Sequence, residues 1–315
     1  MEHVSVLLNE TLNYLDVRDG GVYADLTLGR GGTSSEILKR NPHGWLYSFD
    51  LDEKAIEESR PRLEEIGKNF TIIHANFKDV KSELSRYGVS SLNGLTADLG
   101  VSSPQFDDAN RGFSYREDAP LDMRMNQEQI LDAKTIVNTY EEYELIRIFR
   151  DYGEDPDSVR VAKAIVRYRE QKNIETTGEL VEIIKGAKPV TSLVKKGHPA
   201  KQIFQALRIE TNGELDNLKA MLSSLDSLIL PEGRVVLISF QSLEDRLVKE
   251  AFHHLTVVEG TRHGVDLLPS AIQQAPFVSL TRKPLEPSES EIAHNHRATS
   301  AKLRAIEKRK GDQSL

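Results

Sequence analysis

The chain contains no cysteine among its 315 residues. Disulfides, thiolate zinc sites and cysteine nucleophiles are therefore excluded together. The sequence also lacks an uninterrupted apolar run of membrane-spanning length, and its first residues, MEHVSVLLN, lack the basic region and cleavage site of a signal peptide. We therefore expect a cytoplasmic protein with no membrane partner.

An excess of positive charge is missing as well. The formal net charge is −8, which argues against a protein that binds nucleic acid through a basic charge spread over its whole surface. A local basic patch is still compatible with this charge. Charged residues (29%) and hydrophobic residues (38%) occur in the proportions of an ordinary globular protein, and the length suits one large domain or two modest ones.

A glycine-rich stretch from Asp25 to Thr33 organises the first part of the chain. It follows an apolar run at 22–26 that is typical of a buried strand, and it precedes a helix-like segment at 34–40. A strand, a glycine turn and a helix cradle nucleotides in α/β proteins. Three glycines would let the backbone approach such a ligand: Gly29, Gly31 and Gly32. The pattern is neither G-x-G-x-x-G nor a P-loop, so an ordinary glycine turn stays open.

Strand and helix patterns alternate through residues 1–106. Helices are expected at 10–15, 53–66 and 80–87, and strands at 22–26, 45–49, 70–74 and 94–98. This alternation indicates a parallel sheet with right-handed crossovers, as in a Rossmann-like α/β fold.

The segment 107–211 has no convincing strand. Helices are predicted at 141–150 and 158–170, a third opens on a capping box at Thr176, and a fourth carries Pro199 in its first turn. We expect an inserted all-α domain of about a hundred residues with its own small core.

The α/β rhythm returns in 212–315. The predicted elements are a helix at 215–225, a turn at 231–233, a strand at 234–240, a helix at 243–252, a final strand pair at 255–258 and 277–281, and a basic tail at 302–310.

Two residues after predicted strands suit a nucleoside. Asp50 ends the second strand, where a carboxylate can accept hydrogen bonds from ribose hydroxyls. Its alternative role is to cap the next helix, which Asp52 fills better. Phe77 follows the third strand and could stack on an adenine ring, although a lone Phe also suits the core.

The run DLGVSSPQ at 98–105 is the most unusual in the chain. It places an acid, two hydroxyls, a proline and an amide at the carboxyl edge of the sheet: Asp98, Ser102, Ser103, Pro104 and Gln105. It resembles the (Asp/Asn/Ser)-Pro-Pro-(Tyr/Phe) loop of methyltransferases that modify exocyclic amines, with Gln in the aromatic's place. The alternative is a simple turn at Ser-Ser-Pro.

These residue types match the chemistry of such an amine. The lone pair of a cytosine amine is delocalised into the ring, and acceptors on its N–H groups localise and orient that pair toward a sulfonium methyl. Asp98, the seryl oxygens and the carbonyl before Pro104 are suitable acceptors. Methylation at ring carbon C5 usually needs a cysteine, which this chain lacks.

Ordered motifs along nearly the whole chain resemble the small-subunit (16S) ribosomal RNA cytosine-N4 methyltransferase H family, also called MraW. They lie at 3–10, 25–32, 98–109, 111–114, 120–125, 198–200, 204–208, 239–246 and 302–304. The resemblance implies a Rossmann-like class I S-adenosylmethionine methyltransferase sheet interrupted by a helical domain. It implies a target cytosine near the decoding centre of small-subunit ribosomal RNA. It also implies S-adenosyl-L-methionine contacts at Gly31, Gly32, Thr33, Asp50, Phe77, Asp98 and Gln105.

The chain departs from this family's usual pattern at two histidines. Thr33 and Gln241 stand where the family usually has His, and the segment 295–300 also differs. A methylated amine can release its proton to water, so the enzyme hypothesis does not need either histidine. A divergent target, a non-catalytic ribosome-assembly factor and a nicotinamide-dependent dehydrogenase stay as alternatives.

Local basic groups could form a phosphate track on this acidic protein. Arg160, Lys163 and Arg167 share one helical face. Further candidates for contact with RNA or a 30S particle are Arg111, Arg124, Lys195 and Lys196, together with the basic tail. Solvated helix faces are the alternative. Because the target base must leave its stack, Phe106, Phe113 and Tyr115 are candidate stacking partners.

The sequence shows no legible metal site, because His253-His254 and His294-x-His296 lack an obvious carboxylate partner. The oligomeric state is left open, with a homodimer as one option.

Overall fold

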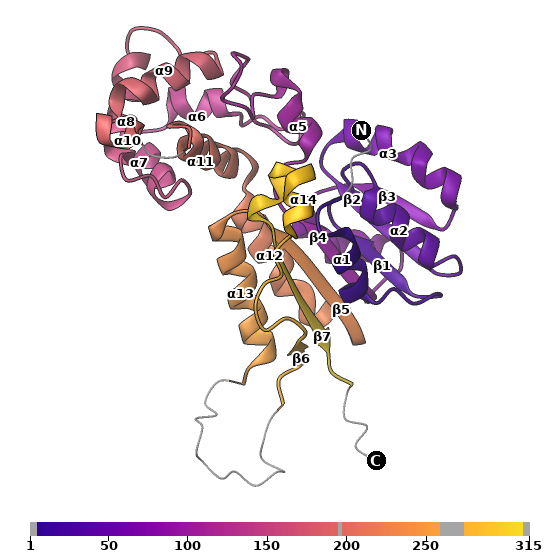
Figure 1. The fold of residues 1–315 in the computed structure, drawn as a ribbon. Helices are drawn as coiled ribbons and strands as arrows, with labels where there is room; N and C mark the ends of the chain where they lie inside the picture. Colours follow the sequence, from indigo (N-terminus) through magenta and orange to yellow (C-terminus); the bar gives the residue numbers. More distant parts are fainter. Residues whose placement is uncertain (1–4, 195–196, 259–273, 311–315) are drawn as a thin grey trace, which may run out of the picture. The chain divides into compact units, whose positions relative to one another are not determined.

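The computed structural model describes residues 5–194, 197–258 and 274–310, apart from the side chain of Ser103. The chain divides into two compact units (Figure 1). One, which we call the sheet unit, contains Met1–Gly100 and Leu215–Leu315, and the other, the helical unit, contains Val101–Glu214. The boundaries expected from the sequence, at 106/107 and 211/212, lie a few residues from these.

The sheet unit is built on a seven-stranded sheet with the order β3-β2-β1-β4-β5-β7-β6. Its strands are β1 (Val22–Asp25), β2 (Trp45–Asp50), β3 (Phe70–His74), β4 (Leu92–Asp98), β5 (Ile229–Ser239), β6 (Phe277–Ser279) and β7 (Lys302–Lys308). Strands β1 to β5 pair in parallel, and β7 is antiparallel to both of its neighbours. Because β1 pairs with β2 on one side and β4 on the other, the strand order reverses between β1 and β4.

Helices cover both faces of this sheet because its buried strands are apolar on both faces. Along β1, Tyr23 packs into one core cluster and Ala24 into the other, and Leu46 and Tyr47 of β2 alternate in the same way. The elements of the unit other than strands are α1 (Leu8–Leu15), α2 (Gly32–Arg40), α3 (Glu53–Ile66), η1 (Phe77–Asp79), α4 (Val80–Arg86), α12 (Glu214–Leu228), α13 (Ser242–Thr256), α14 (Glu289–His294) and η4 (His296–Ser300).

The predicted basic tail at 302–310 is wrong, because its residues 302–308 form β7 inside the sheet. Leu303, Ala305 and Ile306 are fully buried, whereas the basic residues of β7 form ion pairs with Asp245 and Asp226. Arg304, for example, donates to Asp245 at 2.7 Å. Apolar and charged residues alternate at 302–308, which is typical of a strand. The prediction of a tail rested on the number of basic residues and overlooked this alternation.

Two further predictions near the end of the chain need correction. The segment 255–258 is no strand, since α13 continues to Thr256, and the partner of β6 is β7. The predicted turn at 231–233 lies within β5, where the pairing with β4 shifts register and Glu232 has a φ of 63°. The turn residues therefore mark an irregularity in a long strand instead of its beginning.

The helical unit has its own apolar core. Its elements are α5 (Ser103–Asp107), η2 (Ala109–Arg111), α6 (Ala133–Thr139), α7 (Glu142–Asp151), α8 (Ser158–Arg169), α9 (Thr177–Ala187), α10 (Val190–Leu193) and α11 (Lys201–Asn212). Side chains from four of these helices, including Phe149, Ile165, Leu180 and Leu207, are fully buried together. The capping box at Thr176 is confirmed, since its Oγ1 accepts from the N–H of Glu179 at 3.2 Å. Pro199 lies just before α11, not in its first turn.

Candidate functional site

The glycine loop joins β1 to α2 at the carboxyl edge of the sheet, where the strand order reverses. Gly29 and Gly31 have φ angles of 49° and 72°, in the left-handed region that favours glycine. A Cβ on Gly31 would lie 3.3 Å from the Cβ of Ser59, whose Oγ donates to the carbonyl of Gly29 at 2.6 Å. A Cβ on Gly32 would lie 2.2 Å from the Oγ of Ser5. Ser59 and Ser5 therefore pack closely against the loop, which has room only for glycine at positions 31 and 32.

Asp25 is the last residue of β1, and its side chain forms hydrogen bonds with the glycine loop and with the start of α2. One carboxylate oxygen accepts from the Ser34 hydroxyl at 2.7 Å, and the other accepts from the N–H of Thr27 at 3.2 Å. Burial raises the pKa of Asp25 to about 7 in spite of these hydrogen bonds. Asp25 was not predicted as a site residue, although an acid in a buried strand immediately before the loop is a visible signal.

Asp50 is the last residue of β2, and its side chain forms a hydrogen bond with the backbone of the glycine loop. Its two oxygens accept from the backbone N–H groups of Gly29 at 2.8 Å and of Asp52 at 2.9 Å. Burial raises its pKa. Asp52, and not Asp50, caps α3, because its side chain accepts from the N–H of Lys54. Since a carboxylate oxygen has two lone pairs, Asp50 keeps the capacity to accept from a ligand hydroxyl.

Asp98 ends β4, and its carboxylate differs from those of Asp25 and Asp50. Its Oδ1 is buried and makes no hydrogen bond within the described part of the chain. Burial, reinforced by the negative charges of Asp25 and Glu244, raises the pKa of Asp98 to about 8. A buried acceptor without a partner is costly and rare in native proteins, so it points to a function that supplies the partner.

The carboxyl end of β5 carries a second acceptor of this kind. Gln241 lies directly before α13, and its Oε1 is buried without a hydrogen-bond partner among the described residues. Its Nε2 donates to Glu244 at 2.9 Å, and the other oxygen of Glu244 accepts from the N–H of Phe240 at 3.0 Å. Glu244 was not predicted as a site residue, although it lies inside the family motif at 239–246.

The remaining predicted cofactor residues occupy different settings. Phe77 begins η1 directly after β3 and is partly buried against the core, so both of its suggested roles fit. Thr33 is the second residue of α2 and is partly exposed. Gln105 belongs to the helical unit, where it is buried and its Oε1 accepts from the N–H of Ser102 at 3.0 Å.

The run at 98–105 is divided between the two units. Asp98 belongs to the sheet unit, whereas Ser102 to Gln105 form the start of α5 in the helical unit. Pro104 lies in the first turn of α5, where a missing N–H is tolerated. The side chain of Ser103 lies outside the described part of the structure.

The predicted RNA contacts separate into exposed and internal groups. Arg160, Lys163 and Arg167 are exposed along α8. Arg111 is 5% exposed and donates to the carbonyls of Arg124 and Met125, while Arg124 pairs with Asp122 at 2.7 Å. These contacts favour structural roles for Arg111 and Arg124. Lys195 and Lys196 lie outside the described residues.

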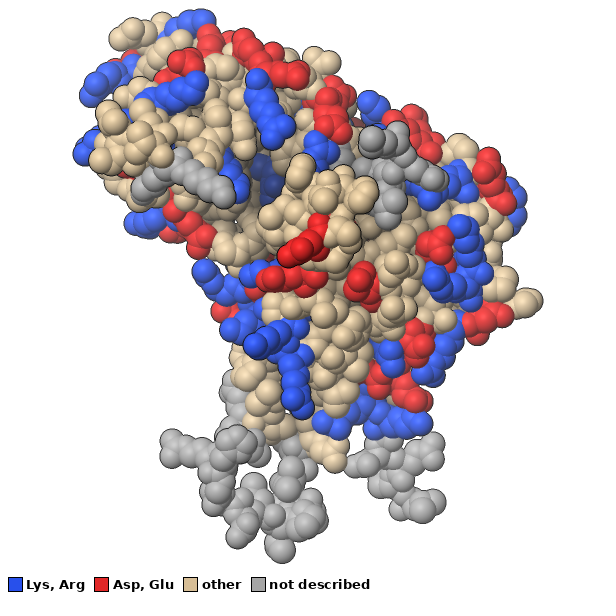
Figure 2. All heavy atoms as spheres, in the orientation of Figure 1, with Lys and Arg blue, Asp and Glu red and all other residues tan. Residues whose placement is uncertain are grey.

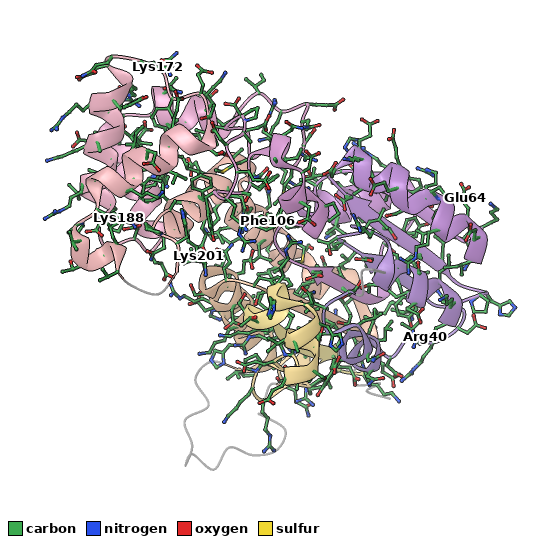
Figure 3. All side chains as sticks on the ribbon, turned by 45° about the horizontal axis from the view of Figure 1, so that its top comes forward. Arg40, Glu64, Phe106, Lys172, Lys188 and Lys201 are labelled. Atoms are coloured by element: carbon green, nitrogen blue, oxygen red, sulfur yellow. The ribbon has the colours of Figure 1, made fainter. Side chains whose placement is uncertain are left out.

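The suggested stacking aromatics of the helical unit are also engaged internally. Phe113 is buried, and the ring of Phe106 meets it edge-on with ring centroids 6.2 Å apart. Phe106, which lies on α5, is labelled in Figure 3. Tyr115 stacks on His198 with ring centroids 4.3 Å apart. Acidic and basic side chains are interspersed on the face drawn in Figure 2, as the net charge of −8 leads one to expect.

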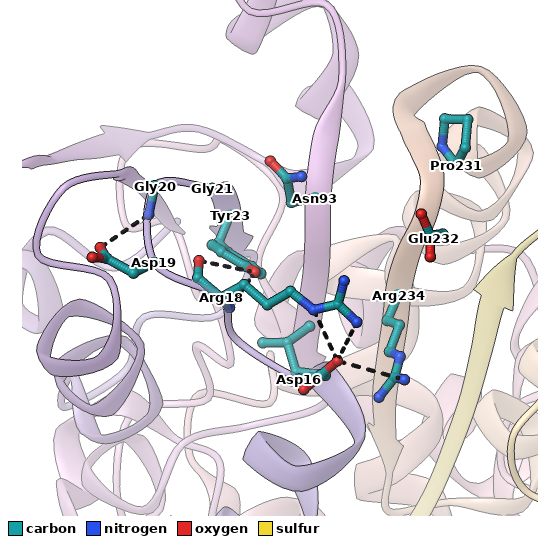
Figure 4. A pocket seen from close by; sticks show the side chains of 11 residues that line it. Asp16, Arg18, Asp19, Gly20, Gly21, Tyr23, Asn93, Pro231, Glu232 and Arg234 are labelled. Carbon is teal, nitrogen blue, oxygen red and sulfur yellow. Dashed lines mark hydrogen bonds and ion pairs between the residues drawn. The ribbon is translucent and has the colours of Figure 1, made fainter. Parts of the chain in front are cut away.

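A hollow of about 240 Å³ lies near the amino ends of β1, β4 and β5 (Figure 4). Its charged groups pair with one another: Asp16 contacts Arg18 at 2.8 Å and Arg234 at 3.6 Å. Ligands of parallel α/β sheets bind at the carboxyl ends of the strands, so this hollow is on the wrong edge for a cofactor. Among the described residues, no group of three or more His, Asp or Glu side chains is placed to hold a metal ion, and no helix has the length and apolar character needed to cross a membrane.

The strand order, the antiparallel β7, the glycine loop and the acids that end β1, β2 and β4 define a Rossmann-like class I methyltransferase domain. The model of the MraW methylase family matches residues 1–309. The chain belongs to this family and is a methyltransferase. A ribosomal RNA small subunit methyltransferase H from Streptococcus mutans serotype c is 47% identical over 309 residues, which cover 97% of each protein.

Solved structures give weaker likenesses. An rRNA methylase from Streptococcus thermophilus aligns with 98% of this chain and 100% of its own, at 13% identity and a TM-score of 0.41. TrmN from Thermus thermophilus aligns with 96% of this chain and 48% of its own, at 13% identity and a TM-score of 0.43. Likenesses of this size carry no conclusion about activity. A nicotinamide-binding sheet has the order 3-2-1-4-5-6 without an antiparallel strand inserted next to β5, so the strand order disfavours the dehydrogenase alternative.

Proposed function

We propose that this protein transfers a methyl group from S-adenosylmethionine to the exocyclic N4 amine of a cytosine in small-subunit ribosomal RNA, near the decoding centre. Family membership over almost the whole chain and the name of its 47% identical relative support the reaction class and the RNA. The observation that carries the proposal is the buried Oδ1 of Asp98 at the end of β4, which has no hydrogen-bond partner in the described part of the chain.

The described residues fit S-adenosylmethionine. The glycine loop would cradle it where a Cβ would clash, Asp50 would accept from its ribose hydroxyls, and Phe77 would pack on its adenine. Thr33, Asp98 and Gln105 are further contacts in this proposal. When bound, S-adenosylmethionine supplies an electrophilic methyl on a sulfonium centre. No metal ion is needed for this chemistry.

The role of Asp98 is to accept a hydrogen bond from the target amine. An ionised carboxylate that accepts from an N–H group draws the nitrogen lone pair out of conjugation and orients it toward the methyl. The hydroxyls of Ser102 and Ser103 and the carbonyl before Pro104 are proposed as additional acceptors. A pKa of about 8 leaves Asp98 able to take up the proton that the methylated amine must lose.

The helical unit is proposed to hold the ribosomal RNA or the 30S particle. Arg160, Lys163 and Arg167 are exposed on one face of α8, and within the described residues none of them forms an ion pair. Such a stripe suits successive phosphates. Lys195 and Lys196 remain predicted contacts, and a cytoplasmic location would follow from such a substrate.

Nucleoside mass spectrometry of small-subunit RNA tests this function. RNA from cells lacking the gene should lose N4-methylcytosine, and re-expression of the wild type should restore it. Asp98→Ala should fail to restore it, whereas Asp19→Asn, at an exposed acid paired with His43, should restore it fully. Equal N4-methylcytosine with and without the gene would refute the proposal and favour an assembly factor. Loss of a different modified nucleoside would reveal a divergent target.

A further inference from the structure

Two buried acceptor oxygens that have no hydrogen-bond partner among the described residues lie at the carboxyl ends of neighbouring strands of the sheet unit. They are Oδ1 of Asp98 after β4 and Oε1 of Gln241 after β5. The two strands pair directly here, with Asp98 in register with Ile238 and the N–H of Leu99 donating to the carbonyl of Ile238 at 2.8 Å. Both oxygens therefore lie at the same edge of the sheet, on adjacent strands.

Glu244 connects the two. It is 3% exposed, accepts from Gln241 Nε2 and contributes to the negative surroundings of Asp98. A Cβ built on Gly100, which follows β4, would lie 3.9 Å from Glu244 Oε1. The end of β4 and the amide of Gln241 thus flank one buried carboxylate.

The carboxylate also fixes which end of the Gln241 amide faces outward. An ionised carboxylate accepts hydrogen bonds and cannot donate them, so the NH₂ end of the amide must face Glu244. The carbonyl oxygen of Gln241 is then turned away from Glu244 as an acceptor. Because the other oxygen of Glu244 is held by the N–H of Phe240, this orientation is well defined.

We propose that Asp98 Oδ1 and Gln241 Oε1 accept the two N–H groups of the target amine, in place of the acceptors at 102–104, and that Glu244 is the positioning residue that orients Gln241. This inference rests on the proposed function and specifies how the site recognises its substrate. A cytosine amine has two in-plane donors and satisfies both oxygens. A uracil presents a carbonyl at the same ring position, which would face two acceptors and be rejected.

The pair also determines where the proton goes. The amine lone pair forms the new nitrogen–carbon bond, the carbon–sulfur bond breaks with its electrons on sulfur, and the nitrogen then carries one proton too many. The Gln241 amide is not basic at neutral pH, so it keeps its hydrogen bond and takes no proton. The proton therefore leaves on the Asp98 side, either to the carboxylate or through it to water.

Three substitutions at Gln241 test the pair in the full-length protein, with small-subunit particles from cells lacking the gene as substrate. Gln241→Leu removes the acceptor and should lower kcat by about 10²-fold, by analogy with the loss of one oriented group in an active site. Gln241→His keeps a donor toward Glu244 and an acceptor on the other ring nitrogen, so it should retain activity within about fivefold. Gln241→Glu should behave like the Leu variant, because two carboxylates would face each other.

Further readouts separate positioning from folding. The dissociation constant for S-adenosylmethionine should stay within about twofold of wild type in all variants, and melting curves report folding. Glu244→Gln should lower kcat several-fold with little change in KM, because a neutral amide no longer fixes the orientation of Gln241. Gln202→Leu in α11 is the matched control and should leave kcat unchanged.

The outcomes distinguish the inference from the function on which it rests. If the wild type produces N4-methylcytosine and Gln241→Leu keeps its kcat within about twofold, the acceptor pair is wrong and the proposed function stands. If Gln241→Leu fails to fold, the other two variants decide. Loss of activity in Gln241→Glu together with retained activity in Gln241→His supports the acceptor pair. Equal activity of Gln241→Glu and Gln241→His overturns it. If the wild type produces no N4-methylcytosine, both proposals fail.

Discussion

The backbone N–H of Asp98 donates a hydrogen bond of 2.6 Å to the Oγ1 of Thr27. This contact ties the end of β4 to the glycine loop that follows β1. The residue proposed to meet the target amine is therefore fixed relative to the loop proposed to hold the methyl donor. A reaction that depends on in-line approach of two groups is sensitive to such a link.

Thr27→Val should uncouple the two elements with little change in volume. We expect a loss of about 1 kcal/mol in the free energy of unfolding, because the N–H of Asp98 loses its acceptor, and a fall of about tenfold or more in kcat. Thr27→Ser retains the hydroxyl and is the control. Single-turnover kinetics and denaturant titration measure the two effects, and a Val variant as active as the Ser variant would contradict the coupling.

Gly31→Ala should weaken binding of S-adenosylmethionine. Its φ of 72° costs an alanine about 1–2 kcal/mol, and the new Cβ would lie against Ser59. Gly88→Ala is a matched control, because Gly88 has a φ of 74° and open space around its Cβ position. Both variants should lose similar stability in thermal melts. Calorimetry should show weaker binding only for Gly31→Ala, and equal weakening in both would remove the loop from the site.

Stability should fall as the pH rises from about 4 to about 8. Burial raises the pKa values of Asp25 to about 7 and of Asp98 to about 8, from 3.8. A carboxyl whose pKa is higher in the folded state stabilises that state while protonated. Its contribution is therefore complete below about pH 4 and is lost as the pH rises through the folded-state pKa.

Asp98→Asn removes one of these titrations and should flatten the decline of Tm between about pH 5 and about pH 9 in the ligand-free protein. Methyl transfer by the wild type should change in the opposite direction and increase as Asp98 ionises near pH 8. A Tm profile of Asp98→Asn parallel to that of the wild type would show that Asp98 is already ionised at low pH.

Replacing Arg160, Lys163 and Arg167 together by Gln should weaken RNA binding and reduce its salt dependence. Loss of three phosphate contacts should lower the slope of log K against log salt by about 3. The control replaces Lys134, Lys172 and Lys185, which pair with Glu175, Glu179 and Glu182. Filter binding at several salt concentrations compares the two triple variants at equal net charge. Identical slopes would mean that the α8 stripe is merely a solvated surface.

Local patterns in the sequence were enough to predict much of the sheet unit. Strands β1 to β4 were expected within a few residues of their bounds, because short apolar runs between turn residues are read without knowledge of distant partners. Asp50 and Asp98 were expected at strand ends for the same reason, and both lie there. The family motifs added the class of reaction and the methyl donor.

The sequence by itself determined the glycine loop, the strand-ending acids Asp50 and Asp98 and the capping box of α9, because each depends on residues close together in the chain. Only the tertiary structure decided that residues 302–308 form β7 beside β5, since that pairing joins segments far apart in sequence. It also decided which polar atoms lack partners. Within the described residues, Asp98 Oδ1 and Gln241 Oε1 are buried without a hydrogen-bond partner, and Arg111 is buried against backbone carbonyls. Whether a polar group is paired depends on neighbours brought together by folding, and no local pattern contains that information.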